Sequence, residues 1–387
     1  MKYLKYIKFI ILAMISILIG IAVAAAIYGF DVNSPWWSHI LVIIGVIFVT
    51  LTVHELTHAL VFSLQKIKIK AVYLFIFMFI RKNKFFTLKV NPKLIILGGG
   101  LVVPLLPPVT NDEELEELSK KIAKSLIAAP IASIVFGFLW FIAFIFVLAF
   151  SSNMALIALG ISSTITILVL TLLVVLASSV ANDQIAGDFV AYEKILDDKE
   201  FKFNVIDSYL HFNPEAHQQS LDYLRSVKDK YLLTKYLGSS QTAQSFIQDY
   251  INAILFHSKS RNYQIEERIM NMNKSLLNTT NEGITTLFMI TYLYYINGEV
   301  EEAFKLLAEL EKVNNPKINS KHLNYEIKRA HHLLNLSDES EYLLNPKNIY
   351  DGFDWVLAPV LDKKEEINLE PLKPGIKVPK IKLYQKI

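Results

Sequence analysis

The segment His54-Glu55-Leu56-Thr57-His58 contains the residues of this chain that are best suited to chemistry. On a helix, two histidines four positions apart lie on the same face, so both imidazoles can bind one Zn²⁺. The glutamate between them is then placed to act as a general base. The spacing therefore predicts a metal-dependent hydrolytic site, with His54 and His58 as ligands and Glu55 as a catalytic residue.

This motif lies near the end of an apolar stretch, residues 41–64, which contains no Lys or Arg and no other acidic residue. A charged group at the centre of a membrane-spanning helix costs about 2.5–3.5 kcal/mol, so such groups usually mark a function. A purely structural histidine does not explain three ionisable residues within so short a segment. We therefore expect a functional site inside a membrane span.

The chain combines 53% apolar residues with 39 basic and 36 acidic residues, and these charges are unevenly distributed. No Lys or Arg occurs between Lys8 and Lys66 or between Lys124 and Lys194, whereas the chain beyond Lys194 is charged throughout. This pattern predicts a membrane half followed by a soluble half. The net charge of +3 forms no basic stripe, so a nucleic acid is excluded as a partner.

Four apolar stretches are long enough to cross a bilayer, at about 7–28, 37–64, 127–150 and 154–180. The first is too long for a typical signal peptide and is interpreted as an uncleaved anchor. Basic residues precede the first span and lie between the second and third, whereas the links 31–36 and 151–153 contain none. The positive-inside rule then predicts a multi-pass cell-membrane protein with both termini in the cytoplasm.

An insert at 66–108 separates the second and third spans. Alternating apolar residues and lysines predict strands within 67–90, with a hairpin turn at 81–84 and a returning strand at 85–90. Three glycines and three prolines interrupt 94–108, which favours a re-entrant loop near the site. The charged segment 112–124 is expected to form a short surface helix.

The expected fold class is an all-α polytopic membrane protein with about four transmembrane helices, a small membrane-associated β insert and a C-terminal α-helical soluble domain. The predicted domains are a membrane metalloprotease domain at 1–192, a cytoplasmic helical domain at 193–364 and an extended or disordered tail at 365–387. Segments 283–295 and 298–310 have the pattern of one tetratricopeptide unit, although a helical pair in an irregular helical domain has the same pattern.

A catalytic zinc needs a third protein ligand and an open fourth position. The chain has no cysteine, so the third ligand must be a histidine or a carboxylate. Only Asp183 and Asp188 are acidic residues near the cytoplasmic end of another span, the fourth. Both also suit the cap of the next helix, and the spacing alone leaves the choice between them open.

At residues 37–192 the chain resembles the site-2 protease family of intramembrane zinc metalloproteases. Members carry HExxH in one span and an Asn-Pro-x-Pro-x-x-Asp-Gly motif in a later one, where the aspartate is the third ligand. Asn182 stands in the place of the asparagine and Asp188 in the place of the aspartate. Ala129, Pro130 and Ser133 fall where the family often has Gly-Pro-x-x-Asn, and the strand-containing insert is also similar.

The second motif departs from the family pattern, since Asp183 and Ile185 replace both prolines, and Phe189 replaces the glycine. A glycine precedes Asp188 instead. The resemblance implies one Zn²⁺ per chain, bound by His54, His58 and Asp188, with Glu55 as the base. It also implies that Asn182 stabilises an oxyanion or holds the substrate, although an asparagine there equally suits a helix cap.

The expected partners are a membrane-spanning or membrane-associated peptide substrate, the lipid bilayer, and a protein bound by the C-terminal helical domain. A substrate helix must unwind before hydrolysis, and the 67–90 strands offer an edge for it to pair with. An alternative is a catalytically inactive zinc-binding membrane scaffold, which the intact Glu55 disfavours. A transporter is disfavoured because the chain shows no repeated halves.

Histidines outside the motif are interpreted as having no ligand role. His39 is expected at the membrane interface beside Trp36 and Trp37, which suit an aromatic belt. The other six show no ligand spacing and are expected on solvated faces; they are His211, His217, His257, His322, His331 and His332.

Overall fold

The structure is a computed structural model of the 387-residue chain. It describes residues 35–82, 85–92, 94, 100–181, 186–257, 260–277, 279–349 and 368–375. The chain divides into two compact units, Met1–Gln219 and Ser220–Ile387. The predicted first span at 7–28, together with Asn182 and Asp183, lies outside the described residues.

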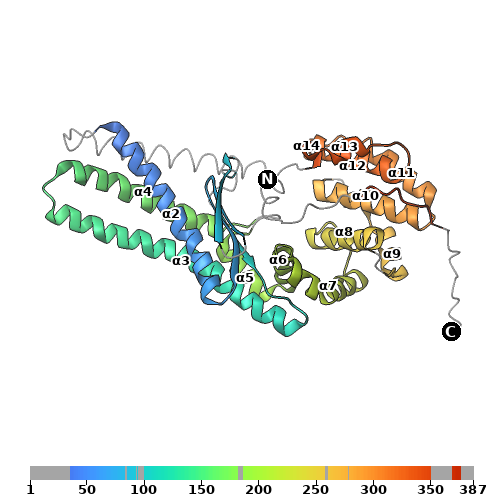
Figure 1. Ribbon diagram of the computed structural model, residues 1–387, viewed down its shortest axis with the longest axis horizontal. Helices are drawn as coiled ribbons and strands as arrows, with labels where there is room; N and C mark the ends of the chain where they lie inside the picture. The colour runs from blue at the N-terminus through green and yellow to red at the C-terminus, as the bar shows by residue number, and fades with distance from the viewer. Residues whose placement is uncertain are drawn as a thin grey trace. The chain divides into compact units, whose positions relative to one another are not determined.

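Three long apolar helices run side by side in the first unit (Figure 1). They are α2 (Trp36–Leu64), α3 (Asp112–Phe150) and α4 (Met154–Ser178), and each is long and apolar enough to cross a membrane. They cover the predicted spans at 37–64, 127–150 and 154–180. The predicted separate helix at 112–124 was wrong, because no Gly or Pro breaks the chain before 127 and α3 runs on without interruption.

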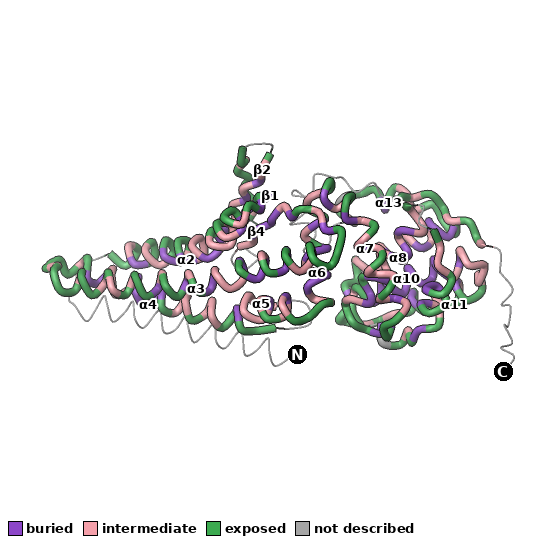
Figure 2. The backbone as a smooth tube through the Cα atoms, turned by 90° about the horizontal axis from the view of Figure 1, so that it is seen from below, coloured by how far each residue is buried: buried purple, intermediate pink, exposed green. Residues whose placement is uncertain are grey.

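The surface of these helices is apolar and their contacts with one another are partly polar. Large side chains such as Phe138, Phe146 and Phe150 are exposed, whereas Ser133, Ser162 and Thr166 are buried. This arrangement is typical of helices whose outer solvent is lipid. Figure 2 shows the exposed and buried segments alternating along all three helices.

His39, which the sequence predicted to lie at the membrane interface, is fully buried. Its Nδ1 lies 2.8 Å from Ser162 Oγ on α4. The sequence of α2 alone could not show this, because the partner comes from a different helix. Trp36 and Trp37, at the same end of α2, are exposed as an aromatic belt requires.

The insert forms a four-stranded antiparallel sheet in the order β3-β2-β1-β4. Its strands are β1 (Lys68–Leu74), β2 (Phe77–Lys82), β3 (Phe85–Val90) and β4 (Gly100–Leu105). The predicted hairpin is present as β2 paired with β3, but Arg81 and Lys82, which had been assigned to its turn, belong to β2 and pair with Phe86 and Phe85. Residues 83 and 84 of the predicted turn lie outside the described residues.

The prediction of a re-entrant loop at 94–108 was wrong for residues 100–105, which form β4 and pair with β1. The run Leu101-Val102-Val103 has the apolar, β-branched character of a buried strand. Pro104 is tolerated because β4 is an edge strand, and because the pairing register shifts between Ile69 and Ala71, where Pro104 pairs.

Two short helices return the chain to the membrane helices after α4. Helix α5 (Asp188–Asp197) packs on α3, and α6 (Lys199–Leu210) packs on α3 and β4. The side chain of Asp198 caps α6 by accepting hydrogen bonds from the backbone N–H groups of Glu200 and Phe201. The buried Lys202 then donates a hydrogen bond to Glu116 of α3, which ties α6 to α3.

The second unit is built from helices around the buried helix α10 (Asn281–Ile296), which contacts α8, α9, α11 and α12. The predicted helical pair at 283–295 and 298–310 corresponds to α10 and α11, and its classification as a tetratricopeptide unit stays a prediction. The remaining elements are α7 (Pro214–Thr234), α8 (Gln241–Phe256), α9 (Tyr263–Met270), η2 (Lys274–Leu276), α11 (Val300–Leu310), α12 (Ser320–Leu333), α13 (Ser340–Leu344) and α14 (Pro346–Ile349).

Residues 368–375 of the predicted tail lie without helix or strand against the second unit. The backbone N–H of Leu372 donates to Leu333 O at 2.7 Å, and that of Gly375 donates to Tyr295 O at 3.1 Å. This part of the tail is therefore held by backbone hydrogen bonds to α10 and α12.

Candidate active site

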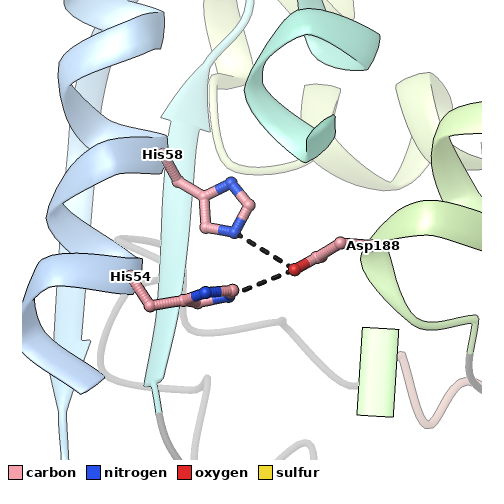
Figure 3. A group of neighbouring side chains, drawn as sticks. All are labelled: His54, His58 and Asp188. Carbon is pink, nitrogen blue, oxygen red and sulfur yellow. Dashed lines mark ion pairs between the residues drawn. The ribbon is translucent and has the colours of Figure 1, made fainter. Parts of the chain in front are cut away.

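Three of the predicted site residues converge at one point of the first unit (Figure 3). Helix α2 places His54 and His58 on one face, with ring centroids 5.1 Å apart. Asp188 points between them from the first residue of α5. Its Oδ2 lies 3.1 Å from Nε2 of His54 and 3.7 Å from Nε2 of His58. The structure thus brings together residues separated by more than a hundred positions in the sequence.

Gly187 explains how Asp188 reaches the histidines. Its N–H donates to Val180 O at 2.9 Å, and Ala181 and Ala186 form an antiparallel bridge that closes the loop. A Cβ at residue 187 would lie 2.1 Å from Ala177 O, so a side chain has no room there. The glycine before Asp188 therefore allows the chain to turn tightly at the end of α4 and start α5 beside α2.

Two serines on α3 orient the imidazoles. Ser133 Oγ lies 3.1 Å from His54 Nδ1, and Ser125 Oγ lies 3.2 Å from His58 Nδ1. Each serine donates its own hydrogen to a backbone carbonyl, of Ala129 and His58 respectively, so it accepts from the histidine. The proton of each imidazole is then on Nδ1, and the Nε2 lone pairs face Asp188.

This donor set fits a zinc ion. Two Nε2 lone pairs and a carboxylate oxygen lie within 4.8 Å of one another, and three acceptors this close repel unless a cation lies among them. Burial acts to raise the pKa of Asp188, but the His54 and His58 side chains beside it hold that pKa below its usual range. The carboxylate is therefore ionised, which is the form that binds a metal.

Glu55 lies between the two histidines and is 8% exposed. A Cβ at Gly100 would lie 2.4 Å from Glu55 Cγ and 2.5 Å from Tyr73 O. Strand β4 therefore begins with a glycine where the side chain of Glu55 lies against the sheet. Among the described residues, the carboxylate of Glu55 has no hydrogen-bond partner, so it is available to a reactant.

A cavity of about 310 Å³ joins these groups. Its walls come from α2, β4, α3, α4, α5 and α6. The lining residues are Leu51, His54, Glu55, His58, Phe62, Gly100, Leu101, Val102, Ile122, Ser125, Leu126, Val174, Ala177, Ser178, Gly187, Asp188 and Tyr209.

The sheet edge at this cavity is β4, from which Gly100, Leu101 and Val102 line the wall. The edge predicted within 67–90 is present as β3, the other edge strand of the sheet, and the pairing of a substrate with that edge stays a prediction.

Tyr209 is a cavity residue that the sequence did not indicate. It lies on α6, in a segment that had been assigned to the soluble domain. Burial raises the pKa of Tyr209 to about 12, and the negative charges of Asp188 and Glu55 contribute to this rise. Its hydroxyl makes no hydrogen bond within the described part of the chain. Tyr209 therefore presents a protonated donor to the cavity.

Comparison with known families decides the class of this protein. A sequence model of Peptidase family M50 matches residues 42–321. The chain belongs to this family, the site-2 protease family. The resemblance drawn from the motifs is thereby confirmed, and family membership supports metalloprotease activity and a membrane location. No curated protein and no solved structure matches the chain.

Proposed function

We propose that this M50 member is an intramembrane zinc metalloprotease that hydrolyses peptide bonds of membrane-bound or membrane-associated substrates. The observation that supports it most is the convergence of His54, His58 and Asp188 beside Glu55 in a cavity among membrane-spanning helices. We place the protein in the cell membrane as a multi-pass protein with cytoplasmic termini, and the helical second unit as a binding domain for a protein partner.

The histidines and Asp188 would hold one zinc ion, and the fourth position would face the cavity. When bound, zinc supplies Lewis acidity, which lowers the pKa of water toward about 7 and polarises a carbonyl group. Ser133 and Ser125 keep both Nε2 atoms unprotonated for this role.

Glu55 would move the proton. Its carboxylate takes a proton from the attacking water and returns it to the leaving amine, so one residue serves as base and then as acid. The burial of Glu55 beside the cavity supports this assignment, because its carboxylate accepts no hydrogen bond from a described residue and can bind the water directly. Asn182 is retained as a candidate for holding the substrate or its oxyanion.

Tyr209 would donate a hydrogen bond to the carbonyl oxygen of the scissile peptide as negative charge develops there. This assignment is supported by its position on the cavity wall and by its protonated hydroxyl. The oxygen of the tetrahedral intermediate needs a hydrogen-bond donor, and the carboxylate of Glu55 cannot donate to it while it acts as the base.

The outer edge of β4 would align the substrate. An unwound substrate segment pairs with the free backbone groups of an edge strand, and β4 is the edge strand that lines the cavity. Since Gly100 lies against Glu55, such a strand would pass the catalytic glutamate directly.

The test uses the full chain in proteoliposomes with a mixture of transmembrane peptides, and cleavage is read by mass spectrometry. We expect Glu55→Gln to keep zinc and to lose cleavage by roughly 10²–10⁴-fold, the usual contribution of a general base. Asp188→Ala is expected to lose both, whereas Asp197→Ala, an exposed aspartate on the same helix, should lose neither. Cleavage by Glu55→Gln at the wild-type rate would contradict the proposal, and zinc without any wild-type cleavage would favour the inactive scaffold.

A further inference from the structure

A second group of metal-binding side chains lies at the turn between α6 and α7, within the first unit. Asp207 lies in the last turn of α6, His211 is the C-cap residue of that helix, and His217 lies in the first turn of α7. One donor atom from each of the three residues lies within 4.8 Å of the other two. None of these residues lines the cavity of the candidate active site.

The turn holds His217 against α6 by several hydrogen bonds. The N–H of Asn213 donates to Leu210 O at 2.9 Å, and its side-chain amide donates to Leu106 O at 2.8 Å. Pro214 then starts α7, a position where its missing N–H costs nothing. The N–H of His217 donates to Asn213 O at 2.9 Å. The three donors therefore meet because of the fold of the turn itself.

The imidazole of His211 is oriented for ligation. Its Nδ1 lies 2.8 Å from the backbone carbonyl oxygen of Asp207, which can only accept, so Nδ1 carries the hydrogen. Nε2 of His211 is then left with its lone pair. Metal-binding histidines usually have one ring nitrogen held in this way. The rings of His211 and His217 lie 4.4 Å apart at 39°, so both imidazoles occupy the same small region.

The burial of Asp207 distinguishes this group from side chains that meet by chance on a protein surface. Asp207 is 7% exposed, whereas His211 is exposed and His217 is half-buried. A metal bound here would have a buried anionic ligand on one side and access to water on the other. Two imidazoles and one carboxylate suit Zn²⁺ and similar divalent transition metals, whereas Mg²⁺ and Ca²⁺ prefer oxygen ligands alone.

We propose that Asp207, His211 and His217 form a second metal site, which binds Zn²⁺ or a similar divalent transition metal. Bound zinc ties the first turn of α7 to the last turn of α6. Helix α6 carries Tyr209 into the active-site cavity, and α7 continues along the chain past Gln219 into the second unit. The site is therefore structural, and it acts on the segment that links the catalytic unit to the helical unit.

Zinc content tests the proposal. The purified full chain is stripped of metal, incubated with zinc chloride alone, separated from free zinc and analysed for bound metal. We expect about two zinc ions per chain for the wild type and about one for His217→Ala. The double variant His54→Ala/His58→Ala should also bind about one, and its combination with His217→Ala should bind none. His257→Ala, a histidine outside both groups, serves as the matched control and should bind two.

Thermal unfolding provides a second measurement that does not depend on catalysis. In the His54→Ala/His58→Ala background only the proposed second site remains, so added zinc is expected to raise the Tm. The rise should disappear when His217→Ala is added. An unchanged Tm in the double variant, or one zinc ion in both the wild type and His217→Ala, would overturn the second site. Neither result tests the zinc site formed by His54, His58 and Asp188. The protease proposal is tested independently by the cleavage assay.

Discussion

Two buried glutamates, one in each unit, have opposite surroundings. In the second unit, Glu266 is fully buried and accepts hydrogen bonds from Arg261 at 2.5 and 3.0 Å and from the Asn297 amide at 3.0 Å. In the first unit, Glu55 is almost as buried, but no hydrogen bond to it comes from any described residue. Among the described residues, the carboxylate of Glu266 has hydrogen-bond donors and that of Glu55 has none.

The difference separates a structural charge from a reactive one. Removing a carboxylate from water is costly unless hydrogen bonds and an opposite charge compensate for it. Arg261 and Asn297 provide that compensation for Glu266. Glu55 lies instead on the wall of a cavity beside three metal-binding side chains, where a water molecule and a substrate would supply the missing contacts. Unmatched local interactions of this kind are expected at functional sites.

The two units also differ in where they place apolar side chains. The second unit buries residues such as Phe246, Phe288 and Leu293, as a water-soluble helical domain does. The first unit exposes Phe138 and Phe146 and buries serines and threonines between its helices. In Figure 2 the buried segments gather inside the second unit. The outer solvent of the first unit is therefore lipid, and its interior is the polar region where chemistry can occur.

Exchanging Glu55 and Glu266 separately for glutamine tests this comparison most directly. Glu266→Gln is expected to destabilise the second unit by about 2–4 kcal/mol, because Arg261 loses its charge partner and the new amide meets two donors. Glu55→Gln is expected to change stability by less than about 0.5 kcal/mol, since the carboxylate loses no hydrogen bond from a described residue. Denaturant unfolding followed by circular dichroism measures both. Equal losses of stability in the two variants would show that Glu55 is also a structural residue.

The contact between Glu55 and the sheet gives the next largest effect. Gly100→Ala would push the glutamate away from β4, since the added Cβ would lie 2.4 Å from Glu55 Cγ. A displacement of about 1 Å at a reacting group can reduce the rate by about 10²-fold, so we expect a loss of this size in cleavage with zinc content unchanged. Gly45→Ala is the matched control on α2, because a Cβ there meets nothing within 4 Å. If Gly100→Ala cleaves like Gly45→Ala, the position of Glu55 does not depend on the sheet.

The sequence predicted those parts of the site that depend on local spacing. Helical periodicity alone places His54, Glu55 and His58 together, and the charge pattern of the spans limited the third ligand to Asp183 or Asp188. The structure describes Asp188 beside both histidines, while Asp183 lies outside the described residues.

Features that depend on contacts between distant segments were missed. Strand β4 contains a proline and starts at a glycine, so its sequence resembles a loop, and only pairing with β1 makes it a strand. The burial of His39 depends on a different helix, whose Ser162 is hydrogen-bonded to its imidazole. The spacing of Asp207 and His211 could have indicated a possible ligand pair, but His217 joins them only through the α6–α7 turn. The sequence around Tyr209 did not indicate a functional role, because the local sequence of a tyrosine that lines a cavity does not differ from that of any other helical tyrosine.

Tyr209→Phe gives the smallest predicted effect and examines whether the helices beyond the membrane spans take part in catalysis. The substitution keeps the ring and removes one hydroxyl, so packing and zinc content should not change. A neutral hydrogen bond contributes about 0.5–1.5 kcal/mol, and we therefore expect kcat to fall by about 2- to 10-fold with KM unchanged. Tyr192→Phe on α5, which does not line the cavity, is the control and should leave kcat unchanged. A rise in KM at constant kcat would mean that Tyr209 binds the substrate before the reaction and does not stabilise the developing charge, because an interaction equal in both states changes KM alone.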